Sequence, residues 1–244
     1  MAKLKQMDAV KIDFDGWLKE NDEERMDANH PYFQETRPEC VRRHLSRYRQ
    51  AANILDDLEA CTVIDAPCGT GYGSEILAGK DRYVLGVDAD GTAVEYAREK
   101  YSCAGRAVYM RQRIEALLIP PHFFVTSKKP PQYEVVVCIE GIEHTSNENT
   151  SKWLKTFYNI GAQYLIMAYP ENGKSNLSEG GFHVIETDIA RVACWLNWNG
   201  WRLDNYWLQD RQSFVYFSLK DLIDKKLRLI DFEMPSAMIL AERM

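Results

Sequence analysis

The chain has 244 residues, of which 45% are hydrophobic, and this length and apolar content can bury the full core of one large domain. A formal net charge of −6 at pH 7 disfavours indiscriminate attraction to nucleic acid or to an anionic membrane. A small or locally recognised substrate fits better.

The 6 cysteines include no Cys-x-x-Cys pair and no paired spacing with histidine, which predicts free thiols in a reducing compartment. The chain shows no basic-then-apolar leader, and no stretch approaches the roughly 18 apolar residues that cross a bilayer. We therefore expect a cytoplasmic protein without membrane contact.

Residues 1–37 are charged and weakly patterned, and we expect an arm or lid, or partly disordered chain, in this segment. From Pro38 onward, apolar residues recur at helical spacing as far as Leu58. This predicts a long helix that packs beside the rest of the fold. The other faces of this helix carry Arg42, Arg43, Arg47 and Arg49.

Strands then alternate with helices, which is the pattern of a parallel sheet with helical crossovers. We expect strands at 62–65, 83–88, 107–111, 133–139 and 164–169, with helices at 73–79, 91–101 and 150–161 between them. The final third adds a helix at 186–198 and strands at 201–208, 213–219 and 237–241.

A glycine-rich stretch follows the first of these strands. Residues 63–73 run Val-Ile-Asp-Ala-Pro-Cys-Gly-Thr-Gly-Tyr-Gly, and glycine backbone lets a ligand lie against the chain. The next strand ends in Asp88, about 20 residues further on, where a carboxylate can accept from both hydroxyls of a ribose. Together these features predict a site for a nucleoside-containing cofactor.

The charge of Asp65 distinguishes two classes of such cofactor. A dinucleotide brings a pyrophosphate to this turn, and a carboxylate at the strand end repels it. S-adenosyl-L-methionine instead brings a sulfonium and an ammonium, which a carboxylate attracts. The glycine order 69, 71, 73 also differs from the Gly-x-Gly-x-x-Gly of dinucleotide sites. Asp65 therefore favours S-adenosyl-L-methionine.

Three segments in order resemble motifs of the class I S-adenosylmethionine-dependent methyltransferases: 63–71, 85–97 and 135–144. The resemblance is to the branch that includes ubiquinone-biosynthesis O-methyltransferases and bacterial small-molecule and sugar methyltransferases. It implies an α/β fold with a Rossmann-like, open, mostly parallel seven-stranded sheet, flanked by helices and with an antiparallel last strand. We expect an arm or lid at 1–37, the methyltransferase domain at 38–220, and a C-terminal extension at 221–244 that can add a final strand.

The resemblance also implies which residues hold the cofactor. Asp65, Gly69 and Gly71 would line its methionine and ribose part, Asp88 would hold the ribose diol, and Glu140 would lie near the transferred methyl group. The full predicted set is Asp65, Ala66, Gly69, Gly71, Asp88, Ala89, Gln112, Ile114 and Glu140.

Two positions depart from the family pattern. Pro67 stands where the glycine series usually opens, and proline fixes φ and removes an N–H. After the third strand, where relatives often carry an acid that accepts from the adenine amino group, this chain has Gln112 and Arg113. The Gln112 amide oxygen can accept from that group, and Arg113 cannot.

A hydroxyl acceptor needs a base to take its proton, and an ordinary histidine has a suitable pKa. His144 and His183 are the candidates, because both fall in loops expected at the carboxyl ends of strands. Structural roles, such as capping or substrate positioning, are the alternatives for both. We expect no metal, because the short cluster that contains His144 lacks a second carboxylate-rich loop.

The acceptor and the oligomeric state are not determined by the sequence. A small-molecule acceptor is favoured and nucleic acid is disfavoured. The alternatives are methylation of RNA or protein, for which the arginines at 42–49 are the motivation, and a non-catalytic subunit that binds the adenosine cofactor.

Overall fold

The computed structural model describes residues 12–22, 25–102, 106–118, 133–171, 185, 187–210, 213–217 and 236–244. The helices in this part are α1 (Phe14–Glu20), α2 (Pro31–Thr36), α3 (Pro38–Asp57), α4 (Tyr72–Ala78), α5 (Gly91–Tyr101), α6 (Asn147–Asn159) and α7 (Ile189–Trp198), with the short 3-10 helices η2 (Ile114–Ala116) and η3 (Ile142–His144). None of the described helices combines the length and the apolar character that a membrane span requires.

The strands form one sheet in the order β3-β2-β1-β4-β5-β8-β6-β7. Their bounds are β1 (Thr62–Asp65), β2 (Tyr83–Asp88), β3 (Ala107–Arg111), β4 (Val135–Ile139), β5 (Tyr164–Pro170), β6 (Trp201–Asp210), β7 (Ser213–Phe217) and β8 (Ser236–Arg243). The first five strands pair in parallel, whereas β8 runs antiparallel to β5 and β6, and β7 runs antiparallel to β6. The Rossmann-like α/β class is confirmed. In the described residues the sheet has eight strands, which correspond to the eight strand segments expected from the sequence and exceed the seven implied by the resemblance, because β7 pairs with the outer edge of β6.

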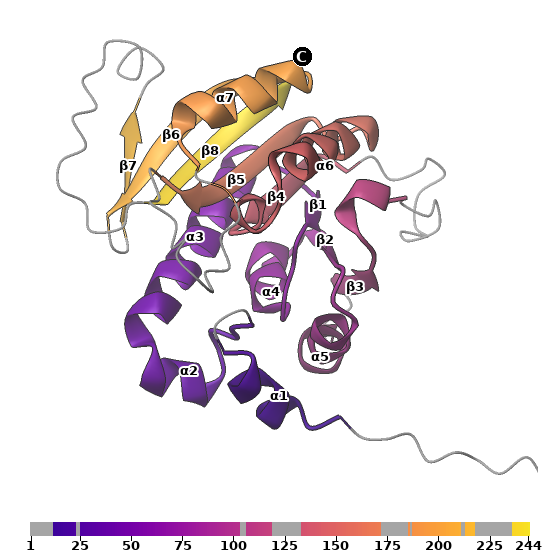
Figure 1. The fold of residues 1–244 in the computed structure, drawn as a ribbon, viewed down its shortest axis with the longest axis vertical. Coiled ribbons are helices and arrows are strands. Elements are labelled where there is room, and N and C mark those ends of the chain that lie inside the picture. Colours follow the sequence, from indigo (N-terminus) through magenta and orange to yellow (C-terminus); the bar gives the residue numbers. More distant parts are fainter. Residues whose placement is uncertain are drawn as a thin grey trace, which may run out of the picture.

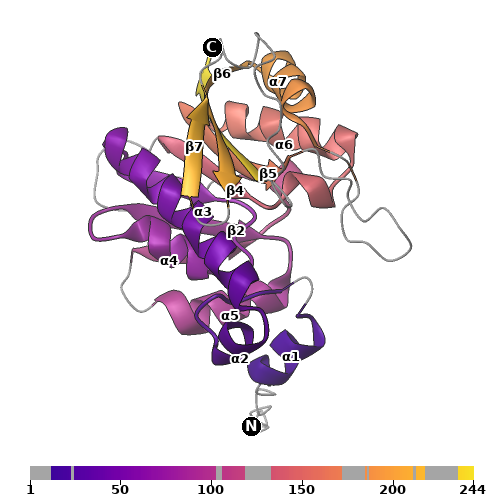
Figure 2. The same ribbon diagram turned by 90° about the vertical axis from the view of Figure 1, so that its left-hand side faces the viewer.

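Helices cover both faces of this sheet, as Figure 2 shows. Successive strand residues point to opposite faces, so Val63 and Val84 pack with α3, α4 and α5, while Ile64 and Leu85 pack with α6 and α7. Every residue of β4 is buried, as expected for a parallel strand covered on both sides. The two apolar clusters hold the carboxyl ends of the central strands in fixed positions.

The expected bounds hold for β1, β2, β3 and α5. Two later helices begin about one turn away from their expected starts, because a polar side chain caps each of them. Ser146 accepts a hydrogen bond from the Asn149 amide, so α6 begins at residue 147 instead of 150. Asp188 accepts from the Arg191 amide, so α7 begins at residue 189 instead of 186.

The described part of the N-terminal segment contains two short helices, which lie at the end of the molecule opposite the C-terminus (Figure 1). The ring of Phe14 on α1 packs edge-to-face on Tyr96 of α5, with centroids 5.3 Å apart. The buried carboxylate of Asp27 accepts hydrogen bonds from Tyr96 at 2.6 Å and from Tyr101 at 2.7 Å. These contacts fasten the segment to α5. Its treatment as a unit separate from 38–220 stays a prediction.

A glycine at the start of α4 allows close approach to α3. A Cβ on Gly73 would lie 2.0 Å from the ring of Tyr48, so we expect Gly73→Ala to lower the free energy of unfolding by about 2 kcal/mol, even after alanine's ~1 kcal/mol helix-propensity gain. Urea denaturation measures this loss. Gly91→Ala is the control, because its Cβ would meet only the movable end of Arg111, at 3.0 Å. Equal losses in the two variants would contradict the packing argument.

Candidate functional site

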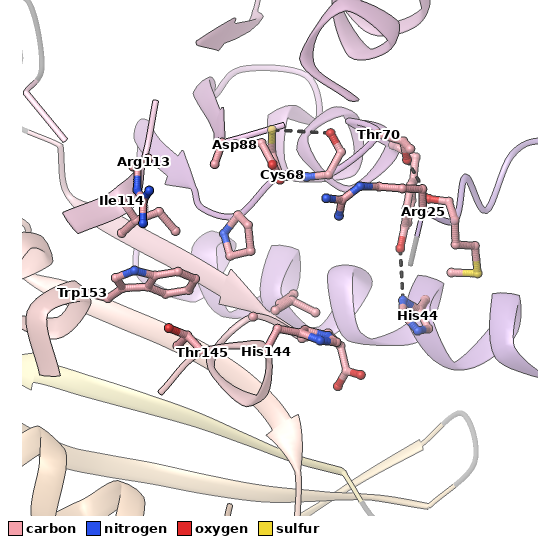
Figure 3. A pocket seen from close by; sticks show the side chains of 18 of the residues that line it. Arg25, His44, Cys68, Thr70, Asp88, Arg113, Ile114, His144, Thr145 and Trp153 are labelled. Carbon is pink, nitrogen blue, oxygen red and sulfur yellow. Dashed lines mark hydrogen bonds between the residues drawn. The ribbon is translucent and has the colours of Figure 1, made fainter. Parts of the chain in front are cut away.

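A cavity of about 1060 Å³ opens at the carboxyl ends of β1, β2 and β4, the edge at which open α/β sheets bind ligands. Figure 3 shows it from close by, with Arg113, Ile114 and Trp153 at one end and Arg25 and His44 at the other. Of the predicted site residues, the cavity is lined by Gly69, Asp88, Ala89, Gln112, Ile114, Glu140 and His144.

Asp88 is held in place by the backbone around it. Its Oδ2 accepts from the amide of Gly69 at 2.9 Å, and its Oδ1 accepts from the amide of Asp90 at 2.9 Å. Each carboxylate oxygen has two lone pairs, so each keeps one for a ligand hydroxyl. The side chain thus ties the glycine turn to the end of β2 and still offers two acceptors beside the cavity.

Asp65, Ala66 and Gly71 do not line the cavity. Asp65 is fully buried, its Oδ2 accepts from Ser74 Oγ at 2.6 Å, and no described group hydrogen-bonds its Oδ1. Gly71 has a φ of 90° and caps α4, and a Cβ there would lie 2.6 Å from that of Ala97. Glycine at 71 is therefore required by the turn, and direct cofactor contact by these three residues stays a prediction.

The predicted adenine end of the cavity has a polar and an aromatic wall. Gln112 donates its Nε2 to the carbonyl of Ala116 at 2.6 Å, which leaves its Oε1 as an acceptor. Trp153 on α6 donates its Nε1 to Glu115 at 3.2 Å, and its ring lies beside Ile114 in Figure 3. Trp153 was not predicted. The early start of α6 places its first turns at this wall.

Glu140 directly follows β4 and has a φ of 50°, which is uncommon for a residue with a side chain. The Arg47 guanidinium lies 3.2 Å from its Oε1, and it also donates to Gln209 at 2.8 Å and to Ser236 at 2.7 Å. Arg47 is buried and does not line the cavity, whereas Arg42 and Arg49 are exposed. This placement does not support a contact between Arg47 and the carboxylate of a cofactor in the cavity.

Of the two predicted catalytic histidines, the structure describes only one. His144 is the last residue of η3 and lines the cavity with an exposed side chain. His183 lies outside the described residues. Within the described ranges, no group of three or more His, Cys, Asp or Glu side chains is arranged to hold a metal ion.

Several cavity residues were missed by the sequence analysis. On α3 and just before it, residues 37, 40 and 44 recur at helical spacing and face the cavity, while the apolar stripe used to predict this helix faces the core. Tyr48 belongs to that stripe and both packs in the core and lines the cavity. From the N-terminal segment, Arg25 donates its Nε to Asp90 at 2.9 Å. The carbonyl of Met26 accepts from Thr70 at 2.6 Å. The helical spacing of the polar residues was the only available signal.

A mostly parallel sheet, a glycine turn after β1, a carboxylate at the end of β2 and a cavity between them define a Rossmann-like nucleoside-cofactor domain. Residues 63–162 match the family model described as a methyltransferase domain. The resemblance to the class I S-adenosylmethionine-dependent methyltransferases found in the sequence is confirmed by this match.

Named relatives agree with this class. A ubiquinone biosynthesis O-methyltransferase of Nitrosomonas europaea is 28% identical over 142 residues, which are 48% of this chain and 56% of that protein. One from Serratia proteamaculans is 26% identical over 148 residues, 50% of this chain and 56% of that protein. The chain thus spans about half the length of the curated relatives it matches.

Solved structures share the fold. The magnesium protoporphyrin IX methyltransferase of Synechocystis PCC 6803, with bound SAH, superposes with a TM-score of 0.64 at 17% identity and covers 95% of this chain and 94% of that chain. At this identity the likeness concerns the fold alone.

Proposed function

We propose that this chain transfers the methyl group of S-adenosyl-L-methionine to a hydroxyl of a small-molecule or sugar-like acceptor. The observation that supports the proposal is the cavity, which brings the Asp88 carboxylate, the glycine turn and His144 to one space at the ends of the strands. When bound, the cofactor supplies an electrophilic methyl group on a positively charged sulfur.

The residues at this end of the cavity fit the cofactor. Asp88 keeps a lone pair on each oxygen for the two ribose hydroxyls. A Cβ on Gly69 would meet no atom within 4 Å, so the turn leaves open space for a ligand beside its backbone. Asp65 does not line the cavity, but its buried carboxylate oxygen without a partner among the described residues would attract the ammonium group of a ligand that reached it.

The size of the cavity supports a second ligand. Pockets for one drug-sized molecule measure about 300–1,000 Å³, and this cavity of about 1060 Å³ is slightly larger than that range. A hydroxyl acceptor agrees with the named O-methyltransferases among the relatives, although the chain spans only about half of their length. A reducing, cytoplasmic setting is part of the proposal, and the five cysteines in the described part are free thiols.

Calorimetry with S-adenosylhomocysteine, followed by transfer of a labelled methyl group to a panel of phenols and sugars, tests the proposal. We expect binding in the micromolar range and label in a small alcohol or phenol. Absence of binding would remove the proposal. Binding with no turnover on any acceptor, RNA and protein included, would instead favour the non-catalytic alternative.

The pKa of the Asp65 carboxyl leads to a prediction of how the affinity for the cofactor depends on pH. Burial raises its pKa to about 7, partly opposed by the Ser74 hydroxyl and reinforced by the Asp88 charge. A carboxyl with a raised pKa in the folded state loses its contribution to stability as pH rises from about 4 to about 7. The ammonium of the ligand favours the ionised form. Affinity for S-adenosylhomocysteine should therefore fall about tenfold per pH unit below about 7 and level off above it.

Calorimetry across this pH range checks the slope. Asp65→Asn has no proton to lose at this position, so its affinity should be weak and independent of pH. A slope that persists in Asp65→Asn would assign the titration to another group.

A further inference from the structure

A histidine outside the predicted set faces the cavity from α3. His44 is half-buried and lines the cavity, and its Nδ1 lies 3.2 Å from the hydroxyl of Tyr72, the first residue of α4. Its Nε2 has no hydrogen-bond partner among the described residues. One ring nitrogen is thus anchored and the other is available to a ligand.

The position of His44 assigns it to the acceptor side of the cavity. Asp88, the residue proposed to bind the ribose, is the last residue of β2. Strand β1 lies between β2 and β4, and Glu140 follows β4. In Figure 3, His44 lies at the end of the pocket opposite Ile114 and Trp153, the predicted adenine end. Glu140 and His144 line the same cavity as His44, and their charges act on its ring.

Building on the proposed function, we propose that His44 contacts the methyl acceptor directly, accepts a hydrogen bond at Nε2 from its hydroxyl, and takes the hydroxyl proton as the oxygen is methylated. The new O–C bond uses a lone pair of the oxygen, and the bond between the methyl group and the sulfur of the cofactor breaks with its electron pair left on sulfur. The electron pair of the O–H bond stays on the oxygen. The imidazole becomes imidazolium and releases its proton to water once the product leaves.

The local electrostatics keep His44 neutral before the reaction. Its pKa is lowered to about 4, first by burial and then by Arg47, while Glu140 opposes this and Arg43 and His144 add to it. Such a weak base suffices, because an oxygen that has gained a methyl group and kept its proton is an oxonium, a much stronger acid than imidazolium. The positive charge of the sulfonium also disappears as the imidazolium forms, so the cavity gains no net charge.

Tyr72 fixes the tautomer that this role requires. For Nε2 to accept, Nδ1 must carry the ring proton and donate it to the Tyr72 oxygen. Burial raises the pKa of Tyr72, so its phenol keeps its proton and its oxygen still offers a lone pair. The Tyr72 ring is held in turn by an edge-to-face contact with Tyr48, with centroids 5.5 Å apart. Tyr72 is therefore a positioning residue for His44.

Two-bond ¹H–¹⁵N spectra of the ¹⁵N-histidine-labelled full chain test the proposal, with S-adenosylhomocysteine bound and with millimolar phenol as the acceptor probe. His44→Gln identifies the His44 signals. We expect a neutral ring between about pH 5 and 8, with the proton on Nδ1 and an Nε2 shift that moves when phenol is added. A ring that titrates near about 6.5, a proton on Nε2, or no response to phenol would each overturn the proposal.

Two variants separate this role from a structural one. Tyr72→Phe removes only the hydroxyl, so the Nδ1–H tautomer should lose its preference, while Tyr158→Phe, a tyrosine outside the cavity lining, should leave the His44 signals unchanged. With any phenol that the wild type methylates, His44→Gln should lower kcat about 100-fold and leave S-adenosylhomocysteine affinity within about twofold. Failure of the wild type to bind S-adenosylhomocysteine would remove the proposed function itself. Normal binding with a silent His44 would remove only this inference.

Discussion

Asp88→Ala is expected to weaken the binding of S-adenosylhomocysteine by about 100-fold or more. Hydrogen bonds to a charged group contribute about 1.5–3 kcal/mol each, and the carboxylate has one free lone pair on each oxygen for a ribose hydroxyl. Two such bonds correspond to at least about 3 kcal/mol, at 1.4 kcal/mol per tenfold in affinity. The variant also frees the Gly69 amide that shapes the turn. Calorimetry with wild type and variant measures the difference.

Asp81→Ala is the matched control, because Asp81 is exposed just before β2 and does not line the cavity. Its affinity should stay within about twofold of wild type, since exposed substitutions away from a site have small effects. An Asp88→Ala variant that remains folded and binds as well as Asp81→Ala would refute the ribose assignment and, with it, the cofactor orientation proposed here.

Arg47→Met is expected to lower the free energy of unfolding by about 3–5 kcal/mol, the usual cost of removing one partner from a buried ion pair. The guanidinium is 6% exposed and Glu140 18% exposed, so water replaces the lost charge poorly. The same change leaves Gln209 and Ser236 without their donor. Urea denaturation gives the loss, and Arg49→Met, an exposed arginine on the same helix, should change stability by less than about 1 kcal/mol.

A second substitution separates the ion pair from the other contacts of Arg47. In Arg47→Met/Glu140→Gln the carboxylate that has lost Arg47 is also removed, so part of the stability should return compared with Arg47→Met alone. Additive losses in the double variant would show that Glu140 and Arg47 do not interact, and that the hydrogen bonds to β6 and β8 account for the effect.

The local chemistry of the β1–α4–β2 region explains why much of the cofactor end could be predicted. A short apolar strand, a glycine turn and a second strand ending in Asp88 lie within 27 residues, from Thr62 to Asp88, and each follows from patterns a few residues long. Asp90 caps α5 through the amides of Thr92 and Ala93, again over three residues. The folded structure keeps the local conformations that such short-range patterns predict, because few distant contacts compete with them.

The acceptor end could not be predicted in the same way. Arg47 reaches Ser236, a residue 189 positions later, and Thr70 bonds to Met26, 44 positions earlier. No periodicity reports such pairings. The apolar stripe of α3 predicted the helix and its buried side. Cys40 and His44, on another side of the same helix, face a cavity that is complete only once the N-terminal segment has packed.

By itself the sequence determined the class of fold, the order of the three motifs along the chain and the acid at the end of β2, because these depend on side-chain period and turn chemistry within single units. Only the tertiary structure decided that His44 lines the cavity, that Arg47 forms an ion pair with Glu140, and that Asp65 is fully buried and does not line the cavity. The reason is physical: burial and charge pairing depend on which distant segments exclude water from a side chain, and that is settled only when the whole sheet and its helices have packed.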